Sequence, residues 1–284
     1  MKKKNIIWAL LALYLTIVMF SYVVNLFTDF IPVNLWFIWI NAVYLTSPTV
    51  AVLAGIYVLR KYGIKGVHGR SLLFIELSMA AFLIGEFTWM LYEIFLGEKP
   101  FPSIADLFYS VAYPLIMVGV IIGLKLGKIN WTKKRLFLTV SAIIVLSVIT
   151  LYYGIIAAYD QGATLLENSL SIGYVVLDIP IIIGMVLLVN LALEFRGGAF
   201  SGAWVLMAIG MLGRWISDIL FAYFYNQYSG GLIGGTAAYR MIDFGWMANY
   251  LLTALVFIRQ GIALENMDGI VLSKFKTPKG IKTK

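Results

Sequence analysis

Eight long apolar segments, separated by short polar or glycine-rich stretches, make up the hydropathy pattern of this chain. Each segment has roughly 20 residues or more, the length that a helix needs to cross the hydrocarbon core of a bilayer. The pattern predicts an all-α integral membrane protein with one membrane domain over residues 1–264 and a basic tail over residues 265–284. The predicted transmembrane helices cover about 6–28, 34–59, 71–96, 103–124, 136–159, 169–193, 200–226 and 240–260.

The first apolar segment follows the basic sequence MKKKN. Its apolar run of roughly 22 residues is too long for the core of a secretory signal peptide, and no cleavage site of small residues follows it. We therefore expect a signal anchor that stays in the protein as the first transmembrane helix.

Lysine and arginine are concentrated in alternate loops. One side of the predicted membrane domain holds 19 of the 22 Lys and Arg residues. The other three are Lys99 and Arg240 on the opposite side and Arg214 within a segment. The positive-inside rule then predicts a plasma-membrane protein with both termini in the cytoplasm. Since topology and contact with anionic lipid headgroups explain the net charge of +8, we expect a lipid bilayer and no nucleic acid among the partners.

Composition excludes several kinds of chemistry. Hydrophobic residues make up 61% of the chain, against roughly 45–50% in soluble domains. Cysteine is absent and His68 is the only histidine, which excludes disulfides, thiolate metal sites and a histidine pair on haem, and argues against a histidine-based zinc site. The chain has no phosphate-binding loop, dinucleotide fingerprint, HExxH motif or nucleophile elbow. We expect no cofactor and no metal.

Ionisable residues nevertheless occur within the apolar segments. Such residues cost roughly 2.5–3.5 kcal/mol each at the centre of a membrane helix, so they usually face a protein interior or an aqueous cavity. Counted from the predicted helix ends, six of them lie in the outward half of the membrane: Glu86, Asp106, Asp178, Arg214, Asp218 and Asp243. The sequence therefore predicts an acidic cavity that opens outward.

Two of these acids each begin a stripe of one acid and two aromatic residues. Positions i, i+3 and i+7 lie on one face of a helix. The stripes are Asp106, Tyr109 and Tyr113 in the fourth segment and Asp243, Trp246 and Tyr250 in the eighth. These six residues, with Glu86, Asp178, Arg214 and Asp218, are the candidate ligand-binding residues. Interhelical packing or an interfacial aromatic belt is the alternative for the aromatic members.

The two stripes match at an offset of 137 residues and indicate an internal duplication. Gly85-Glu86 matches Gly213-Arg214 at an offset of 128, and Tyr44 with Pro48 resembles Tyr174 with Pro180. The predicted repeats cover about 6–127 and 136–261, and because each has four helices they share one orientation in the membrane. Chance similarity between aromatic-rich apolar helices is the alternative.

Simpler roles are open for several candidates. Arg214 and Asp218 stand at i and i+4, the spacing of a structural ion pair, and Arg214 could instead be shared with Glu86 and Asp178. Asp106 follows Pro102-Ser103, a helix-start signal, so it could cap its helix. Asp243 could pair with Arg240. Asp178, two residues before Pro180, could bond to a neighbouring helix or face the cavity.

Four segments of the chain resemble the polytopic membrane sensory modules at the N-termini of some bacterial diguanylate cyclases and related signalling proteins. They read PSIADLFYSVAYPL at Pro102 to Leu115, YVVLDIP at Tyr174 to Pro180, WISDILFAYFYNQY at Trp215 to Tyr228 and IDFGWMANYLLTAL at Ile242 to Leu255. The resemblance implies that Asp106, Asp178, Asp218 and Asp243 are the module's characteristic polar positions and that the signal passes inward through the eighth helix. Because such proteins carry a catalytic domain after that helix and only about 24 residues follow it here, a separate cytoplasmic partner is expected.

These observations lead to three hypotheses. The first is a non-enzymatic receptor or sensor that binds a small ligand in the outward acidic and aromatic cavity and signals through a cytoplasmic partner. The second is a proton- or cation-coupled secondary transporter, for which the inner halves of the helices offer few polar residues besides Glu76. The third is a membrane-embedded enzyme that modifies lipids.

Overall fold

The computed structural model describes residues 3–28, 30–96, 101–127, 129–196, 201–230 and 242–275 of the 284-residue chain. Over these ranges it contains eight long α-helices, a five-residue π-helical turn and no strand. The helices are α1 (Lys3–Thr28), α2 (Val33–Tyr62), α3 (Gly66–Leu91), α4 (Ile104–Leu124), α5 (Lys133–Ala158), α6 (Leu165–Glu194), α7 (Ser201–Gly230) and α9 (Asp243–Phe275). The π-helical turn η1 (Tyr92–Leu96) directly extends α3.

The helices have the length and surface of a multi-pass membrane protein. Seven of them are each long and apolar enough to cross a bilayer, and α1 contributes a shorter apolar stretch, Thr16–Asn25, among its described side chains. Large apolar side chains point outward along the bundle, as with Phe20, Phe137 and Val148, each more than half exposed. Such a surface is stable against lipid and not against water. The prediction of a multi-pass helical membrane protein is confirmed at this level.

The predicted helix boundaries agree with the structure to within about five residues, except at the end of the chain. The eighth segment is predicted to end near residue 260, whereas α9 continues as helix to Phe275. The helix therefore occupies the first part of the predicted tail, and residues 276–284 lie outside the described part of the chain. A run of polar residues ends a hydropathy pattern without ending a helix, because the backbone hydrogen bonds of a helix do not depend on apolar side chains.

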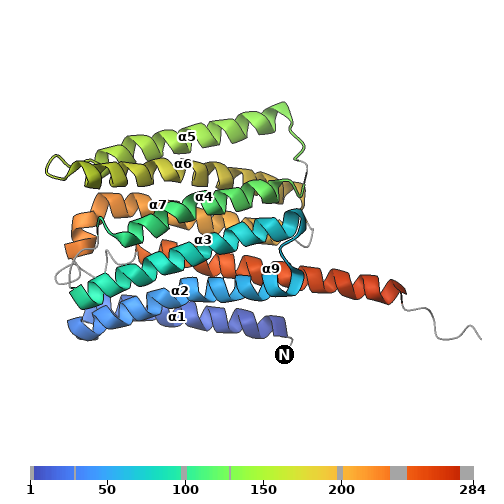
Figure 1. The fold of residues 1–284 in the computed structure, drawn as a ribbon, viewed down its shortest axis with the longest axis horizontal. Coiled ribbons are helices and arrows are strands. Elements are labelled where there is room, and N and C mark those ends of the chain that lie inside the picture. The colour runs from blue at the N-terminus through green and yellow to red at the C-terminus, as the bar shows by residue number, and fades with distance from the viewer. Residues whose placement is uncertain are drawn as a thin grey trace, which may run out of the picture.

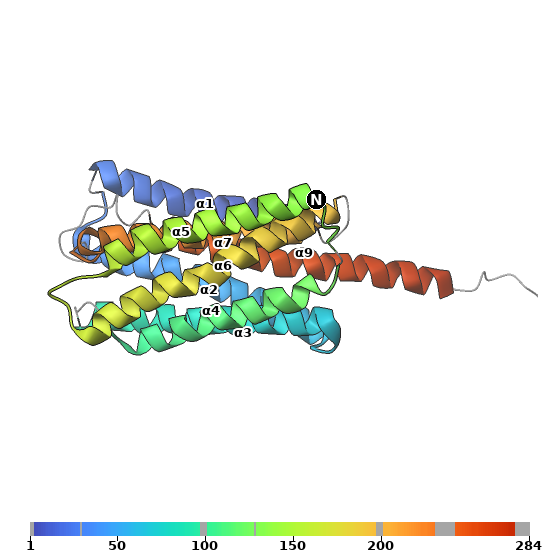
Figure 2. The same ribbon diagram turned by 90° about the horizontal axis from the view of Figure 1, so that it is seen from above.

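The long helices lie side by side along the length of the bundle (Figure 1). Six of them pack in a closed ring with the order α2, α3, α4, α6, α7, α9 and back to α2. Helix α5 packs outside the ring on α6 and α7. Helix α1 also lies outside it (Figure 2), where the Tyr14 hydroxyl donates to the Val43 carbonyl of α2 at 3.0 Å. The interior of the ring is therefore the place where polar side chains can meet away from lipid.

The two ends of the bundle differ in charge. The start of α1 and the far end of α9 lie at the same end (Figure 1), which we name the basic end. It carries Lys and Arg side chains at the end of α2, the end of α4 and the start of α5, among them Arg60, Lys125 and Lys134. The opposite end, where α4, α6 and α9 begin, carries Asp106, Glu167 and Asp243, and we name it the acidic end.

Side-chain caps define the helix starts at the acidic end. In a capping box at the start of α4, the Ser103 side chain accepts from the Ala105 backbone and the Asp106 carboxylate accepts from the Ser103 backbone N–H at 2.6 Å. Thr164 and Glu167 form the same motif at the start of α6. These bonds satisfy N–H groups that have no partner within the helix, and they set the places where α4 and α6 enter the membrane domain.

The basic half of the ring interior is filled with apolar side chains. Helices of the ring contribute side chains that are each 2% exposed or less: Leu72, Ile75, Met79, Ile116, Val120, Leu188, Met207 and Phe257. This core holds the six helices together and leaves the acidic half for the polar residues.

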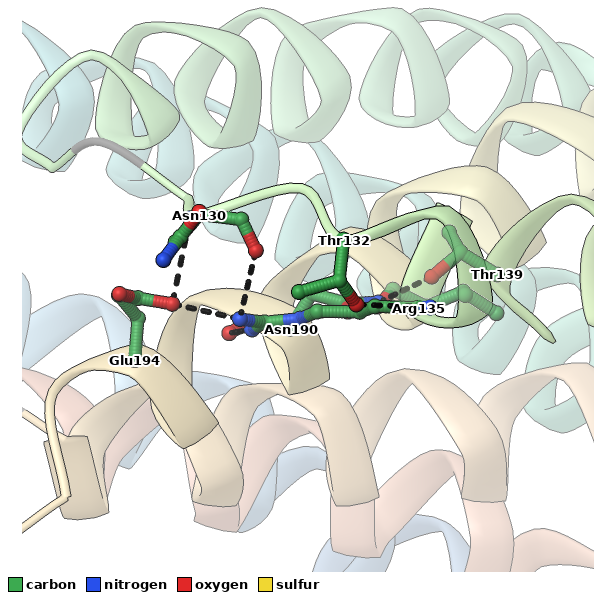
Figure 3. Close-up of polar contacts among 7 residues, drawn as sticks. Asn130, Thr132, Arg135, Thr139, Asn190 and Glu194 are labelled. Carbon is green, nitrogen blue, oxygen red and sulfur yellow. Dashed lines mark hydrogen bonds and ion pairs between the residues drawn. The ribbon is translucent and has the colours of Figure 1, made fainter. Parts of the chain in front are cut away.

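A polar cluster at the basic end ties α5 to α6 (Figure 3). Arg135 donates from Nε to the Asn190 side-chain oxygen at 2.8 Å, from Nη2 to the Asn190 carbonyl, and from Nη1 to Glu194. The Asn190 amide in turn donates to Thr139 Oγ1 at 3.0 Å. Because α5 buries little of its own surface in the bundle, we name this cluster the α5–α6 latch and expect it to fix the position of α5.

Candidate functional site

A cavity with a volume of about 400 Å³ lies at the acidic end of the bundle. Helices α2 to α9 and the turn η1 all contribute to its walls. Arg214 is the one basic side chain among the described residues that line it, against eight carboxyl groups: Glu86, Glu93, Asp106, Asp160, Glu167, Asp178, Asp218 and Asp243. The aromatic lining consists of Tyr44, Trp89, Phe101, Tyr109, Tyr113, Tyr174, Phe221, Tyr223 and Trp246.

The structure brings the ten candidate residues together. Nine of them line the cavity, and Tyr250, which is fully buried, bonds to one of those nine. They come from α3, α4, α6, α7 and α9. Their role in ligand binding stays a prediction, but their gathering in one place is now a feature of the fold.

Glu86 on α3 is held by three tyrosine hydroxyl groups. Tyr250 donates to Oε1 at 2.6 Å, Tyr44 donates to the same oxygen at 3.1 Å, and Tyr109 donates to Oε2 at 2.9 Å. The donors come from α9, α2 and α4, so this one carboxyl group joins four helices. Donors of this kind offset part of the cost of burying a carboxyl group.

Asp218 on α7 has a similar set of donors. Tyr113 donates to Oδ2 at 2.8 Å and the Trp246 indole donates to Oδ1 at 2.7 Å. Arg214, one turn earlier on α7, forms an ion pair with Oδ2 in which the N–O distance is 3.9 Å. The predicted pair at i and i+4 is therefore present, but at a distance too long for a direct hydrogen bond.

Arg214 lies at the bottom of the cavity, where its guanidinium stacks on an aromatic ring. Its central carbon is 3.6 Å from the centre of the Phe82 ring and 5.2 and 5.6 Å from the centres of Tyr113 and Tyr250. The side chain is almost fully buried, and its Nε has no hydrogen-bond partner. A guanidinium stacked in this way keeps its charge at low hydration cost. Arg214, Phe82, Tyr113 and Tyr250 form what we name the cavity floor.

Asp178 on α6 is buried in the wall of the cavity. It lines the cavity and is only 3% exposed, yet its Oδ1 has no hydrogen-bond partner. A buried acceptor in this position can receive a donor from a molecule in the cavity.

The alternatives for Asp106 combine in the structure. Its Oδ2 caps α4 through the Ser103 backbone, and its Oδ1 accepts from the Tyr174 hydroxyl at 2.6 Å while the side chain lines the cavity. Capping and cavity lining are thus compatible for one carboxylate. Asp243 is the first residue of α9 and lines the cavity. Its suggested partner Arg240 lies outside the described residues.

Three functional positions were not among the candidates. Tyr44 and Tyr174 occur in the sequence duplication, and their hydroxyl groups reach Glu86 and Asp106. One signal could have identified these two residues: each is a tyrosine within an apolar segment, and a nearby apolar segment carries an acid. Phe82 gave no signal, because an apolar residue in a membrane helix is expected to face lipid or core.

Two negative findings complete the description. Among the described residues, no group of three His, Asp or Glu side chains is arranged to hold a metal ion. Comparisons with protein-family models, curated proteins and solved structures give no match to this chain.

Proposed function

We propose that this protein is a plasma-membrane receptor that binds a small ligand in the cavity at the acidic end and passes its occupancy to the basic end through α9. The observation that carries the proposal is the cavity itself. Polar and aromatic side chains from helices all around the ring line this cavity and close it. Its volume of about 400 Å³ is within the range of small-molecule sites, roughly 300–1,000 Å³. Buried ionisable groups in a membrane domain are functional by default, because each lowers the stability of the inserted chain.

The floor of the cavity favours binding without passage. Arg214 on Phe82, with Tyr113 and Tyr250 beside it, lies between the cavity and the apolar core. Below the floor, Met79 and Phe257 are fully buried among other apolar side chains. A ligand that enters from the acidic end meets packed side chains there.

Helix α9 is the element suited to relay the signal. Asp243 and Trp246 line the cavity, Tyr250 belongs to its floor, and the same helix continues to Phe275. Its 33 residues correspond to a length of about 50 Å. In Figure 1 the helix projects past its neighbours at the basic end, where a signalling partner would meet it.

The charge distribution supports the orientation. The basic end carries the described lysine and arginine residues of the loops, so the positive-inside rule assigns it, with both chain termini, to the cytoplasm. The cavity then opens to the outside.

The matched residues of the two aromatic stripes have matching hydrogen-bonding roles, which supports the proposed repeat of four plus four helices in one orientation. The carboxyl groups that they bind, Glu86 and Asp218, are not themselves matched positions, because Glu86 matches Arg214. Each of two carboxyl groups, Glu86 and Asp218, accepts from the i+3 aromatic of its own half, Tyr109 or Trp246. Each also accepts from the i+7 tyrosine of the other half: Tyr250 for Glu86 and Tyr113 for Asp218. The ring order of the helices is unchanged when the halves are exchanged. The resemblance to bacterial sensory modules agrees with this proposal, since four of the shared positions are cavity acids.

One observation favours the transporter as a second candidate. Glu76 on α3 and Gln260 on α9 are buried below the floor, and Glu76 Oε2 and both polar side-chain atoms of Gln260 have no partner. Unsatisfied polar atoms at this depth could serve a proton or cation that crosses the floor.

A compound screen followed by uptake measurements separates the two candidates. Purified protein is screened for cationic, neutral and anionic compounds of cavity size that raise its thermal unfolding midpoint. The receptor proposal expects the screen to find such compounds. It expects them to raise the unfolding midpoint less in Glu86→Gln and Asp218→Asn than in the control Glu76→Gln. It also expects uptake of these compounds into proteoliposomes under a pH gradient to stay at background. Uptake above background would favour the transporter, and shifts that are equal in all variants would exclude the cavity as the site.

The relay is tested by spin labels at the basic end. Since the chain contains no cysteine, cysteines introduced at Lys125 on α4 and Leu264 on α9 are labelled selectively. The proposal expects the distance distribution between them to change when a compound from the screen is added. An unchanged distribution at saturation would mean that α9 does not carry the signal.

A further inference from the structure

Asp178 is the acceptor in the cavity that the protein itself leaves open. Glu86 accepts three hydrogen bonds from tyrosines, Asp218 accepts two from aromatic donors, and Asp106 accepts from Ser103 and Tyr174. Asp178 Oδ1 has no donor, although the residue is only 3% exposed. A buried acceptor without a donor lowers stability by about 1–3 kcal/mol, so a donor from outside the chain would stabilise the folded protein.

The charge of the cavity favours a cationic donor. Among the described lining residues, Arg214 is the one basic group, and it already stacks on Phe82 and faces Asp218 at 3.9 Å. The carboxyl groups exceed it in number, and aromatic rings form much of the remaining wall. Carboxylates surrounded by aromatic faces attract organic cations through charge and through the ring quadrupole. A neutral or anionic ligand would leave the excess negative charge without compensation.

We propose that the ligand is a small organic ammonium ion whose N–H groups donate to Asp178 and whose apolar part contacts the aromatic wall. This inference rests on the proposed receptor function and specifies the chemistry of its ligand. Asp178 and Asp218 both line the cavity, so the ammonium ion brings its positive charge to a wall that carries both carboxyl groups.

The other groups around Asp178 are bonded to other partners. From α7, Asp218 and Arg214 face it; from α4, the Tyr113 hydroxyl already donates to Asp218. On its own helix, Tyr174 donates to Asp106, and from α5 the nearby lining residue Thr150 accepts from the Trp215 indole. None of these donors is bonded to Asp178 Oδ1. Asp178 Oδ1 is therefore left for a donor that enters the cavity from outside the chain.

The probes are three compounds of matched shape: 2-phenylethylamine, its trimethylammonium analogue, and the neutral 2-phenylethanol. Isothermal titration gives the affinity of each compound. For the wild-type protein we expect the primary amine to bind at least tenfold more tightly than the other two. The trimethylammonium analogue has the charge but cannot donate to Oδ1.

Variants identify the acceptor. Asp178→Asn is expected to weaken amine binding at least tenfold, whereas Asp178→Glu, which keeps the charge, restores part of the affinity. Glu194→Gln makes the same change from carboxyl to amide at the basic end, outside the cavity, and is expected to bind as the wild type does. If Asp178→Asn does not fold, the comparison of the three probes on the wild-type protein still decides the question.

Each contrary result has its own meaning. Equal affinity for the amine and the alcohol would overturn the ammonium inference and leave the receptor proposal intact. Equal affinity for the amine and its trimethylammonium analogue would overturn the hydrogen bond to Asp178. If the amine does not bind, the inference is wrong, and the screen of neutral and anionic compounds then decides on the receptor proposal separately.

Discussion

Gly85 on α3 gives the sharpest prediction about the architecture of the site. A Cβ atom at this position would lie 2.6 Å from Cε1 and 2.8 Å from Cδ1 of Tyr109 on α4. The Tyr109 hydroxyl donates to the next residue, Glu86, at 2.9 Å. Gly85→Ala therefore forces the ring away from α3 and away from the carboxyl group that it binds.

The size of the effect follows from three contributions. Ordinary contacts of Cβ begin near 3.4 Å, so the ring at 2.6 Å must move by about 0.8 Å, and overpacking of this kind costs about 1–3 kcal/mol. Loss of a hydrogen bond to a buried carboxyl group costs about 1–3 kcal/mol more. Alanine returns about 1 kcal/mol through its higher helix propensity. We expect a net loss of roughly 2–3 kcal/mol in the free energy of unfolding.

Thermal unfolding in detergent, followed by tryptophan fluorescence, measures this loss. In a chain of this size, 1 kcal/mol corresponds to roughly 2–4 °C, so the midpoint should fall by about 4–12 °C. Gly173→Ala on α6 is the matched control, because a Cβ there meets no atom within 4 Å and should leave the midpoint unchanged or slightly higher. A Gly85→Ala protein as stable as the Gly173→Ala protein would refute the described contact between α3 and α4.

Three further predictions concern the latch, the floor and the orientation. Asn190→Ala removes the acceptor of Arg135 Nε and should lower the free energy of unfolding by about 1–3 kcal/mol, while Lys133→Ala beside the latch should change it by less than about 0.5 kcal/mol; equal effects would show that the latch does not hold α5. Tyr113→Phe keeps the ring and removes the donor to Asp218, and it should lower the unfolding midpoint, whereas Tyr159→Phe at an exposed position should not. A cysteine at Gly162 in the α5–α6 loop should react with an impermeant maleimide on intact cells and one at Lys65 only after permeabilisation, and the reverse pattern would contradict the proposed orientation.

The sequence predicts the helices because their apolar runs must cover the thickness of a bilayer. It also predicts that the intramembrane acids lie at one depth, since depth follows from counting residues from a helix end at 1.5 Å each. Glu86 on α3 and Asp218 on α7, which are far apart in the sequence, share one cavity for this reason.

The partners of each acid could not be predicted in the same way. Whether Tyr44 or Tyr250 reaches Glu86 depends on the order of the helices around the ring and on how far each is rotated about its axis. Neither quantity follows from hydropathy in a chain whose helices are apolar on nearly every face. The stacking of Arg214 on Phe82 and the position of Tyr250 in the floor could not be predicted for the same reason.

The α9 boundary illustrates a different limit. The hydropathy pattern predicts a helix end near residue 260, whereas α9 continues to Phe275. The polar run ENMDG at residues 265–269 interrupts the apolar pattern there without ending the helix.

The account depends most on an ammonium ligand at Asp178. Its most direct test is an experimental structure of the protein saturated with 2-phenylethylamine. We predict density for the amine in the cavity at the acidic end, with its nitrogen within about 3.2 Å of an Asp178 carboxyl oxygen and its ring against the aromatic wall. An empty cavity at saturation, or amine density elsewhere on the protein, would contradict the central claim.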